Sequence, residues 1–100
     1  MVRNEVKNEA CNPKRSMAII GFHYVYVISS DADGHRYYTG LTDDLETRLK
    51  EHNSGKVPHT AKYRPWKIET AIAFRSREKA ISFEKYLKSH SGRAFASRHF

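Results

Sequence analysis

Residues 24–52 read YVYVISSDADGHRYYTGLTDDLETRLKEH, two tyrosine-rich runs followed by a charged helical segment. The Asp and Gly residues between the runs supply the turn conformations that join two antiparallel strands. Tyr26 and Tyr38 are equally distant from the expected centre of this turn, so we expect them to lie roughly opposite each other. Arg48 and His52 are four residues apart, which places them on one face of a helix. The stretch therefore predicts that two phenols, a guanidinium and an imidazole converge.

The alternation of large and small or polar side chains continues further along the chain. From residue 66 to residue 74 every second side chain is aromatic or β-branched, a pattern typical of a strand. The chain therefore predicts a small α+β domain, with a three-stranded, mostly antiparallel sheet flanked by helices. The expected strands are residues 22–29, 36–41 and 66–74, and the expected helices lie near residues 43–52 and 77–90.

The first helix has recognisable start and packing signals. Thr42 or Asp43 is expected to cap it, because either side chain can accept a hydrogen bond from the first turn. Leucines recur every four residues and are expected to dock the helix on the sheet. These leucines are Leu41, Leu45 and Leu49. Gly40 precedes them and removes a side chain beside the expected site, which indicates either a close approach of a ligand or another backbone, or a bulge or bend.

The second helix begins after Ser76, its expected cap, and carries an apolar stripe on one face. The stripe consists of Ala80, Phe83 and Leu87. Glu84 lies at the edge of this stripe. We expect Ser91 and Gly92 to end the helix, with a short final turn or helix over residues 93–100.

Residues 1–17 contain charges and amides but few large apolar groups, so burial cannot offset the entropy of ordering them. We expect a flexible polar leader over residues 1–17 and one domain over residues 18–100. The single cysteine, Cys11, cannot form an internal disulfide, which favours a reducing compartment. No run approaches the roughly 20 apolar residues that span a bilayer. We therefore expect a soluble cytoplasmic protein without a membrane partner.

Basic residues are concentrated in the second half of the chain. Residues 1–55 contain seven Lys and Arg against eight Asp and Glu, whereas residues 56–100 contain eleven against three. Phosphate contacts release counterions, so a basic half favours a nucleic-acid partner; a solvated basic surface is the alternative. A loop before the third strand has the basic and aromatic side chains to follow a nucleic-acid backbone. These residues are Lys56, His59, Lys62, Tyr63 and Arg64.

The order of these motifs resembles the GIY-YIG nuclease family over roughly residues 22–90, and especially its small stand-alone bacterial members. Tyr24-Val25-Tyr26 and Tyr38-Thr39-Gly40 stand for the two tripeptides that name the family, with matches only at the aromatic and glycine positions. Leu41 stands where some relatives, such as DNA-repair nucleases, carry a lysine. Further matching positions are Arg48, His52-Asn53, Gly55, Arg64-Pro65-Trp66 and Glu84.

The resemblance implies a metal-dependent endonuclease that hydrolyses phosphodiester bonds in DNA, with structure-selective or weak sequence specificity. It implies Tyr38 as the general base, with Tyr26 hydrogen-bonding beside it and His52 assisting proton transfer. Arg48 can donate two N–H groups to the scissile phosphate. Glu84 can hold one Mg²⁺ or Mn²⁺ ion, since Mg²⁺ commonly takes only one or two protein carboxylates.

Each of these assignments has a structural alternative. Arg48 could pair with Asp44 on the helix surface, and Glu84 could pair with Lys88. The strand tyrosines expected to serve the core alone are Tyr24 and Tyr37. The functional alternative is a catalytically weak or inactive nucleic-acid-binding module or adaptor that uses the same basic surface. Zinc is not expected, because the sequence has neither a Cys-x₂-Cys nor a His-x₃₋₅-His pair.

Overall fold

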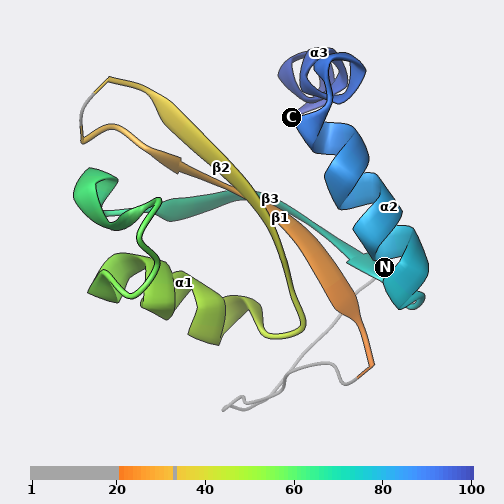
Figure 1. The fold of residues 1–100 in the computed structure, drawn as a ribbon, viewed down its shortest axis with the longest axis horizontal. Coiled ribbons are helices and arrows are strands. Elements are labelled where there is room, and N and C mark those ends of the chain that lie inside the picture. The colour runs from red at the N-terminus through yellow and green to blue at the C-terminus, as the bar shows by residue number, and fades with distance from the viewer. Residues whose placement is uncertain (1–20, 33) are drawn as a thin grey trace, which may run out of the picture.

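The computed structural model describes residues 21–32 and 34–100, so the expected leader over residues 1–17 lies outside the described residues. Figure 1 shows the described elements, which run from a hairpin through α1 and a third strand to two C-terminal helices. In chain order they are β1 (His23–Ser30), β2 (Arg36–Thr42), α1 (Leu45–Ser54), the 3₁₀ turn η2 (Ala61–Tyr63), β3 (Lys67–Phe74), α2 (Arg77–Lys88) and α3 (His90–His99).

β1 is the middle strand of the sheet, whose order is β2-β1-β3. It pairs antiparallel with both neighbours, which confirms the predicted three-stranded antiparallel sheet. Six consecutive residues of β1, from Val25 to Ser30, are buried. This burial on both faces explains why the strand is a nearly continuous run of aromatic and β-branched residues rather than an alternating one.

The pairing of β1 with β2 places Tyr26 opposite Gly40 and Ile28 opposite Tyr38. Tyr26 and Tyr38, predicted to lie roughly opposite each other, are not direct partners, because the hairpin is centred one residue later than the sequence symmetry indicated. The two tyrosines instead lie diagonally on the same face, and their ring centroids are 6.5 Å apart. The shift leaves a glycine directly opposite Tyr26.

Helices cover the two faces of the sheet separately (Figure 1). On one face Tyr26 and Ile28 pack with Trp66 and with Leu45 and Leu49 of α1. The opposite face packs against α2 and α3 through a second cluster. Its members are Val25, Val27, Ala80 and Leu87, with Leu41, Phe74, Phe83, Phe95 and Ala96 packed against them. The domain thus has two small cores that share the middle strand.

Two predictions about side chains of β2 are wrong. Leu41 does not dock α1, because it pairs with Val25 and points to the α2 and α3 face. Tyr37 is 61% exposed rather than a core residue, since β2 is an edge strand of the sheet. Tyr24, on the middle strand, is half-buried, as expected for a tyrosine that packs against the sheet.

The N-cap of α1 is Asp44, not Thr42 or Asp43. Asp44 accepts a hydrogen bond from the backbone N–H of Thr47 at 3.1 Å. Thr42 still belongs to β2, and its hydroxyl accepts a bond from the Asp44 N–H instead. Gly55 ends the helix with a φ of 86°, a left-handed conformation that favours glycine. These caps fix where the helix that carries Arg48 starts and stops.

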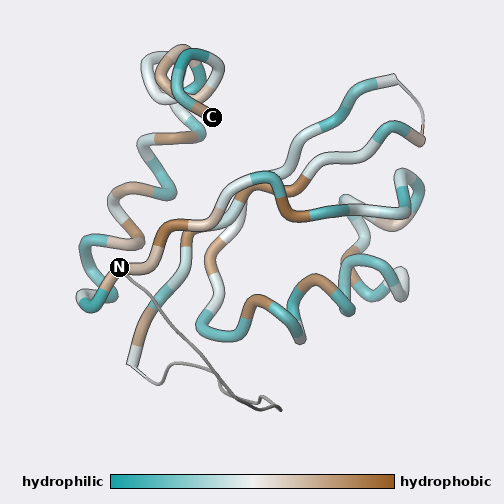
Figure 2. The backbone as a smooth tube through the Cα atoms, turned by 180° about the vertical axis from the view of Figure 1, so that it is seen from behind, coloured by the Kyte–Doolittle hydropathy of each residue, from teal (hydrophilic) through white to brown (hydrophobic). Residues whose placement is uncertain are grey.

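α2 begins after Ser76, as predicted, but it ends at Lys88 rather than at Ser91 and Gly92. Ser89 caps a full third helix, accepting a hydrogen bond from the Gly92 N–H at 3.1 Å. Gly92 lies so close to α2 that a Cβ there would overlap the backbone of Tyr86 and Leu87. Figure 2 shows hydrophobic and hydrophilic stretches alternating along α1 and α2, as helices with one buried face require.

Candidate active site

Tyr26 is the central residue of the candidate site and is only 2% exposed. Its ring lies directly over Gly40 on the neighbouring strand, where an added Cβ would be 2.5 Å from Cζ of the phenol. Real Cβ atoms do not approach other heavy atoms so closely. The group that approaches Gly40 is neither the ligand nor the backbone that the sequence suggested: the glycine makes room for the side chain of Tyr26.

His52 lies in the last turn of α1 and is fully buried. Its Nε2 is 2.9 Å from the Tyr26 hydroxyl, and its Nδ1 is 2.8 Å from Oγ1 of Thr60. The Thr60 hydroxyl donates to the carbonyl of Val57, so its oxygen is available to accept the Nδ1 proton. This network assigns the proton of neutral His52 to Nδ1. Nε2 then accepts the hydroxyl proton of Tyr26.

Arg48 reaches the same phenol from one turn earlier on α1. Its Nε donates to the Tyr26 hydroxyl at 3.3 Å, and its Nη1 donates to Glu51 at 2.8 Å. The surface pair considered from the sequence, Arg48 with Asp44, is not formed because the Asp44 carboxylate caps the helix. The Tyr26 hydroxyl therefore accepts from a guanidinium and donates to an imidazole.

Burial sets the charge states of this cluster. It raises the pKa of Tyr26, although the hydrogen bond from Arg48 acts in the opposite direction. Burial, and then the positive charge of Arg48, lower the pKa of His52 below its ordinary value of 6.5. The bonds to Glu51 and Tyr26 raise the pKa of Arg48. At neutral pH the cluster therefore holds a neutral phenol and a neutral imidazole beside a permanent positive charge.

Tyr38 is the second phenol of the cluster and lies on β2, an edge strand of the sheet. Its ring centroid is 5.0 Å from that of His52 in an edge-to-face arrangement. Tyr38 is half-buried, whereas Tyr26 is buried, so Tyr38 is the phenol with more access to solvent. The structure thus brings together four residues that the sequence singled out. They are Tyr26, Tyr38, Arg48 and His52.

A second layer of contacts holds this cluster, and sequence reasoning missed its main member. Thr60 is 1% exposed, and its backbone carbonyl accepts a bond from the indole N–H of Trp66 at 2.8 Å. Asn53 uses both ends of its side-chain amide on the backbone of Trp66, at 2.6 Å and 3.1 Å. Nothing in a loop of charged and polar residues distinguishes Thr60, because its importance arises only from burial beside His52.

Glu84 is placed apart from the phenol cluster. It lies on α2, which covers the opposite face of the sheet from α1, and its carboxylate is 2.6 Å from Nζ of Lys88. The structural alternative for Glu84, a pair with Lys88, is therefore observed. Among residues 21–32 and 34–100, no hydrogen bond or ion pair joins Glu84 to Tyr26, Arg48 or His52.

The described part of the chain contains no group of three or more His, Cys, Asp or Glu residues that could hold a metal ion. A site of the zinc type is thus not formed there. Mg²⁺ is less demanding, because it keeps several waters and needs only one or two carboxylates. Glu84 fits that requirement: its side chain is 17% exposed and supplies hard oxygen ligands, one of which Lys88 now contacts.

The basic loop lies beside α1 and η2. The side chains of Lys56, His59, Lys62 and Arg64 are exposed there. Tyr63 is half-buried against the Tyr26 core, and the Arg36 guanidinium lies 4.2 Å from its ring centroid. The loop therefore presents cations rather than a free aromatic ring, and its fit to a phosphate backbone remains an expectation.

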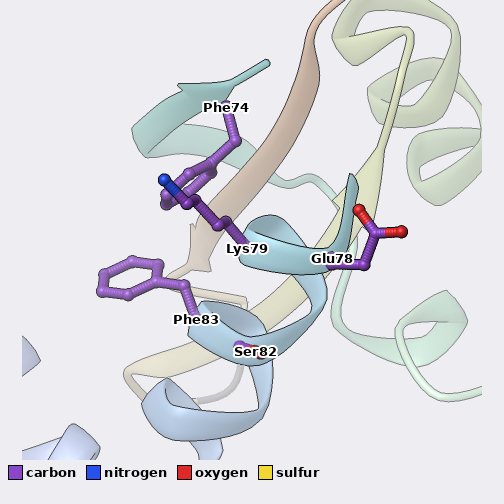
Figure 3. Close-up of a pocket in the computed structure, with 5 residues that line it drawn as sticks. All are labelled: Phe74, Glu78, Lys79, Ser82 and Phe83. Carbon is purple, nitrogen blue, oxygen red and sulfur yellow. The ribbon is translucent and has the colours of Figure 1, made fainter. Parts of the chain in front are cut away.

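A hollow at the other end of the molecule contains none of the predicted site residues. It has a volume of about 470 Å³ and is lined by Phe74, Glu78, Lys79, Ser82 and Phe83. Figure 3 shows Lys79 reaching toward the ring of Phe74, with Phe83 on the same side of α2, while Glu78 points away. The two phenylalanine rings have centroids 5.5 Å apart. With one cation and no converging polar groups, this hollow is the open end of the apolar core.

A buried tyrosine on the middle strand is thus bonded to an arginine and a histidine of one helix. The family model for the GIY-YIG catalytic domain matches residues 22–97, and the chain belongs to this family. The GIY-YIG domain indicates nuclease activity and binding to nucleic acid. No helix in the described part of the chain is long and apolar enough to cross a membrane.

Within the family, the chain is similar to small single-domain proteins. It is 39% identical over 72 residues to the UPF0213 protein BH0048 of Halalkalibacterium halodurans, covering 71% of this chain and 74% of that protein. It is 44% identical over 66 residues to a UPF0213 protein of Streptococcus pneumoniae, covering 65% of each chain. A solution NMR structure of the UPF0213 protein BH0048 from Bacillus halodurans has 34% identity and a TM-score of 0.47, covering 77% of this chain and 83% of that one.

Proposed function

We propose that this protein is a metal-dependent endonuclease that hydrolyses phosphodiester bonds in DNA. The observation that carries the proposal is the Tyr26 hydroxyl, which is held 2.9 Å from Nε2 of His52 and 3.3 Å from Nε of Arg48. A structural tyrosine needs one partner for its hydroxyl. Here the partners are a neutral base and a cation, which is an arrangement suited to moving a proton next to a phosphate.

Water that attacks phosphorus must lose a proton. Neutral His52 can receive this proton through Tyr26. The Tyr26 hydroxyl donates its proton to Nε2 of His52, and the Tyr26 oxygen takes a proton from the neighbouring phenol or from water. This exchange avoids a free Tyr26 phenolate, which burial disfavours. Tyr38, the base that the family resemblance implies, is the more accessible phenol and is proposed to face the attacking water. Because His52 is fully buried, its proton then leaves by the reverse path through Tyr26 to solvent, and the leaving oxygen takes its proton from water.

Arg48 is proposed to bind the scissile phosphate. Its bond to Glu51 joins two side chains that are each 35% exposed, so a doubly hydrogen-bonded phosphate can replace the Glu51 carboxylate as partner. The guanidinium stays charged at every working pH, because the pKa of Arg48 is raised above an already high value. Its charge would oppose the negative charge that develops on phosphate in the transition state.

Glu84 is proposed to hold one Mg²⁺ or Mn²⁺ ion, exchanging its contact with the Lys88 ammonium for the metal. When bound, the ion would supply Lewis-acid stabilisation of charge on the phosphate oxygens. Support for placing Glu84 near the cluster comes from the edge strand: Tyr38 of β2 and Lys88, the partner of Glu84, line one groove.

Cleavage of defined substrates tests this proposal. Purified protein is incubated with supercoiled plasmid, branched DNA, single strands and RNA, with metal or with chelator. Glu84→Ala should abolish metal-dependent cleavage, and Arg48→Ala should lower its rate by at least about 10²-fold, as for other preorganised donors. Glu78→Ala, which removes an exposed carboxylate from the first turn of the same helix, is the matched control and should cleave normally. Equal rates for all four proteins would refute the proposal.

The second candidate is a binding module that does not cleave. The ion pair of Glu84 with Lys88 favours this candidate. Glu84 is the carboxylate proposed to bind the metal ion, and in this structure it binds Lys88 instead. A binding module would retain affinity that falls steeply with salt, since phosphate contacts release counterions. Reversing the charges of Lys62 and Arg64 should weaken that affinity for every sequence. Binding of this kind with no cleavage under any metal condition would establish the second candidate.

A further inference from the structure

A groove of about 530 Å³ lies between the sheet and the C-terminal helix, on the face opposite α1. Its walls come from β2 and from α2 and α3, and Tyr38 contributes to its lining. Tyr38 also contacts His52 through its ring, so this groove adjoins the candidate active site at the sheet edge. The volume falls within the range of about 300–1,000 Å³ that small-ligand pockets have, and is too small for a duplex.

Two exposed aromatic rings belong to this groove. Tyr37 is 61% exposed and Phe100 is 44% exposed, although both are large side chains that globular proteins normally cover in part. Neither ring belongs to the buried members of the two cores. Exposed aromatic rings beside a cationic surface are the stacking platforms that bind unpaired bases, because every base has a π face.

The polar groups of the groove suit the rest of a nucleotide. Lys88 and Arg93 line it, and α3, which carries Arg93, has no acidic residue. Lys88 now contacts Glu84, a contact that a phosphate could replace. Glu69 is the one carboxylate in the lining, and its Oε2 accepts a bond from the hydroxyl of Ser29 at 2.9 Å. A fixed carboxylate accepts hydrogen bonds from the exocyclic amino groups of bases.

We propose that this groove binds an unpaired nucleotide of the substrate, with the base between Tyr37 and Phe100 and the phosphate on Arg93 and Lys88. The inference rests on the proposed function, because it assigns the substrate of that same site. Base-paired DNA cannot enter a pocket of this size. The groove therefore selects nucleic acids with a single-stranded segment next to the bond to be cut.

Binding measured in chelator tests the groove without any cleavage. The probes are fluorescein-labelled oligodeoxycytidylate, the matching oligocytidylate and a blunt duplex, and the readout is fluorescence anisotropy. Tyr37→Ala should weaken single-strand binding by about 5- to 100-fold, the loss of one stacked base. Arg93→Gln should weaken it as well. Tyr37→Phe, which keeps the ring, and Arg98→Gln, an arginine of α3 outside the groove, should bind single strands like the parent.

The two oligonucleotides decide between DNA and RNA, since tighter binding of one identifies the sugar that the groove accepts. Backbone amide shifts in NMR spectra should change at Thr39 and Ala96 on the groove walls when oligodeoxycytidylate is added. Unchanged affinity of Tyr37→Ala and Arg93→Gln, or equal losses for the single strand and the duplex, would overturn the proposal. These results do not depend on catalysis: loss of cleavage in Glu84→Ala with unchanged groove binding would leave the nuclease proposal intact and separate from this one.

Discussion

Replacing Thr60 by valine keeps the shape of the side chain and removes its hydroxyl. That hydroxyl accepts from Nδ1 of His52 at 2.8 Å and donates to the carbonyl of Val57 at 3.3 Å, in a site where Thr60 is 1% exposed. A buried N–H left without a partner costs about 1–3 kcal/mol, and the longer second bond adds about 0.5 kcal/mol. We expect Thr60→Val to lower the free energy of unfolding by about 2–3 kcal/mol.

Thermal unfolding followed by circular dichroism measures this loss. For a domain of this size, 1 kcal/mol corresponds to about 4–8 °C, so the Tm should fall by about 8–20 °C. Thr60→Ser keeps the hydroxyl and loses one methyl group, at about 0.8 kcal/mol, and is the matched control. In ¹⁵N NMR spectra of the imidazole, the parent and Thr60→Ser should show the proton on Nδ1. A valine variant as stable as the serine variant, with the same tautomer, would refute this network.

Two further predictions concern the same cluster. Gly40→Ala should destabilise the protein, because the new Cβ would overlap the Tyr26 ring. Urea unfolding should show a loss of about 1–3 kcal/mol, the usual cost of overpacking. A stability equal to the parent's would show that the ring can move freely. The pKa of His52 is lower in the folded state than in the unfolded state. As the pH falls, the unfolded state therefore binds a proton at a higher pH than the folded state does. The stability that this group contributes is present above about pH 6.5 and is lost as the pH falls through the lower pKa of the folded state. Urea unfolding between these limits should show a smaller pH dependence for His52→Gln than for the parent, and identical slopes would contradict the assignment.

The strands were predictable because their signals are local. Alternation identified β3, and the tyrosine runs identified β1 and β2 within one or two residues of their observed ends. The helix caps were less predictable, because Thr42, Asp43 and Asp44 all have suitable side chains and only the end of β2 selects Asp44. The third helix was underestimated for a similar reason: Gly92 resembles a helix stop in sequence, yet it serves as a close contact between α2 and α3.

The candidate site was predictable where one element carries its residues. Arg48 and His52 share a face of α1, so helical spacing alone placed them together. Their connection to Tyr26 depends on the strand register, in which the partner of Tyr26 is Gly40, two residues beyond Tyr38. The role of Thr60 could not be predicted from the sequence, because it depends on burial beside His52. Whether Glu84 binds Lys88 or another group could not be predicted either, because it depends on which partners the fold brings close to it. The family resemblance supplied the roles, and the metal role of Glu84 stays a prediction.

The side-chain amide of Asn53 forms hydrogen bonds with both the N–H and the carbonyl of Trp66, and so connects the end of α1 to the start of β3. Twelve residues lie between Asn53 and Trp66 in the sequence. These two hydrogen bonds, rather than the course of the intervening loop, fix the position of α1 relative to β3. Within that loop Val57 is buried and its carbonyl accepts the hydroxyl of Thr60, so this residue must keep its place. The exposed side chains of Lys56 and His59 can change in size and charge during evolution while the cluster around Tyr26 keeps its geometry. Relatives could acquire new nucleic-acid preferences there without rebuilding the site.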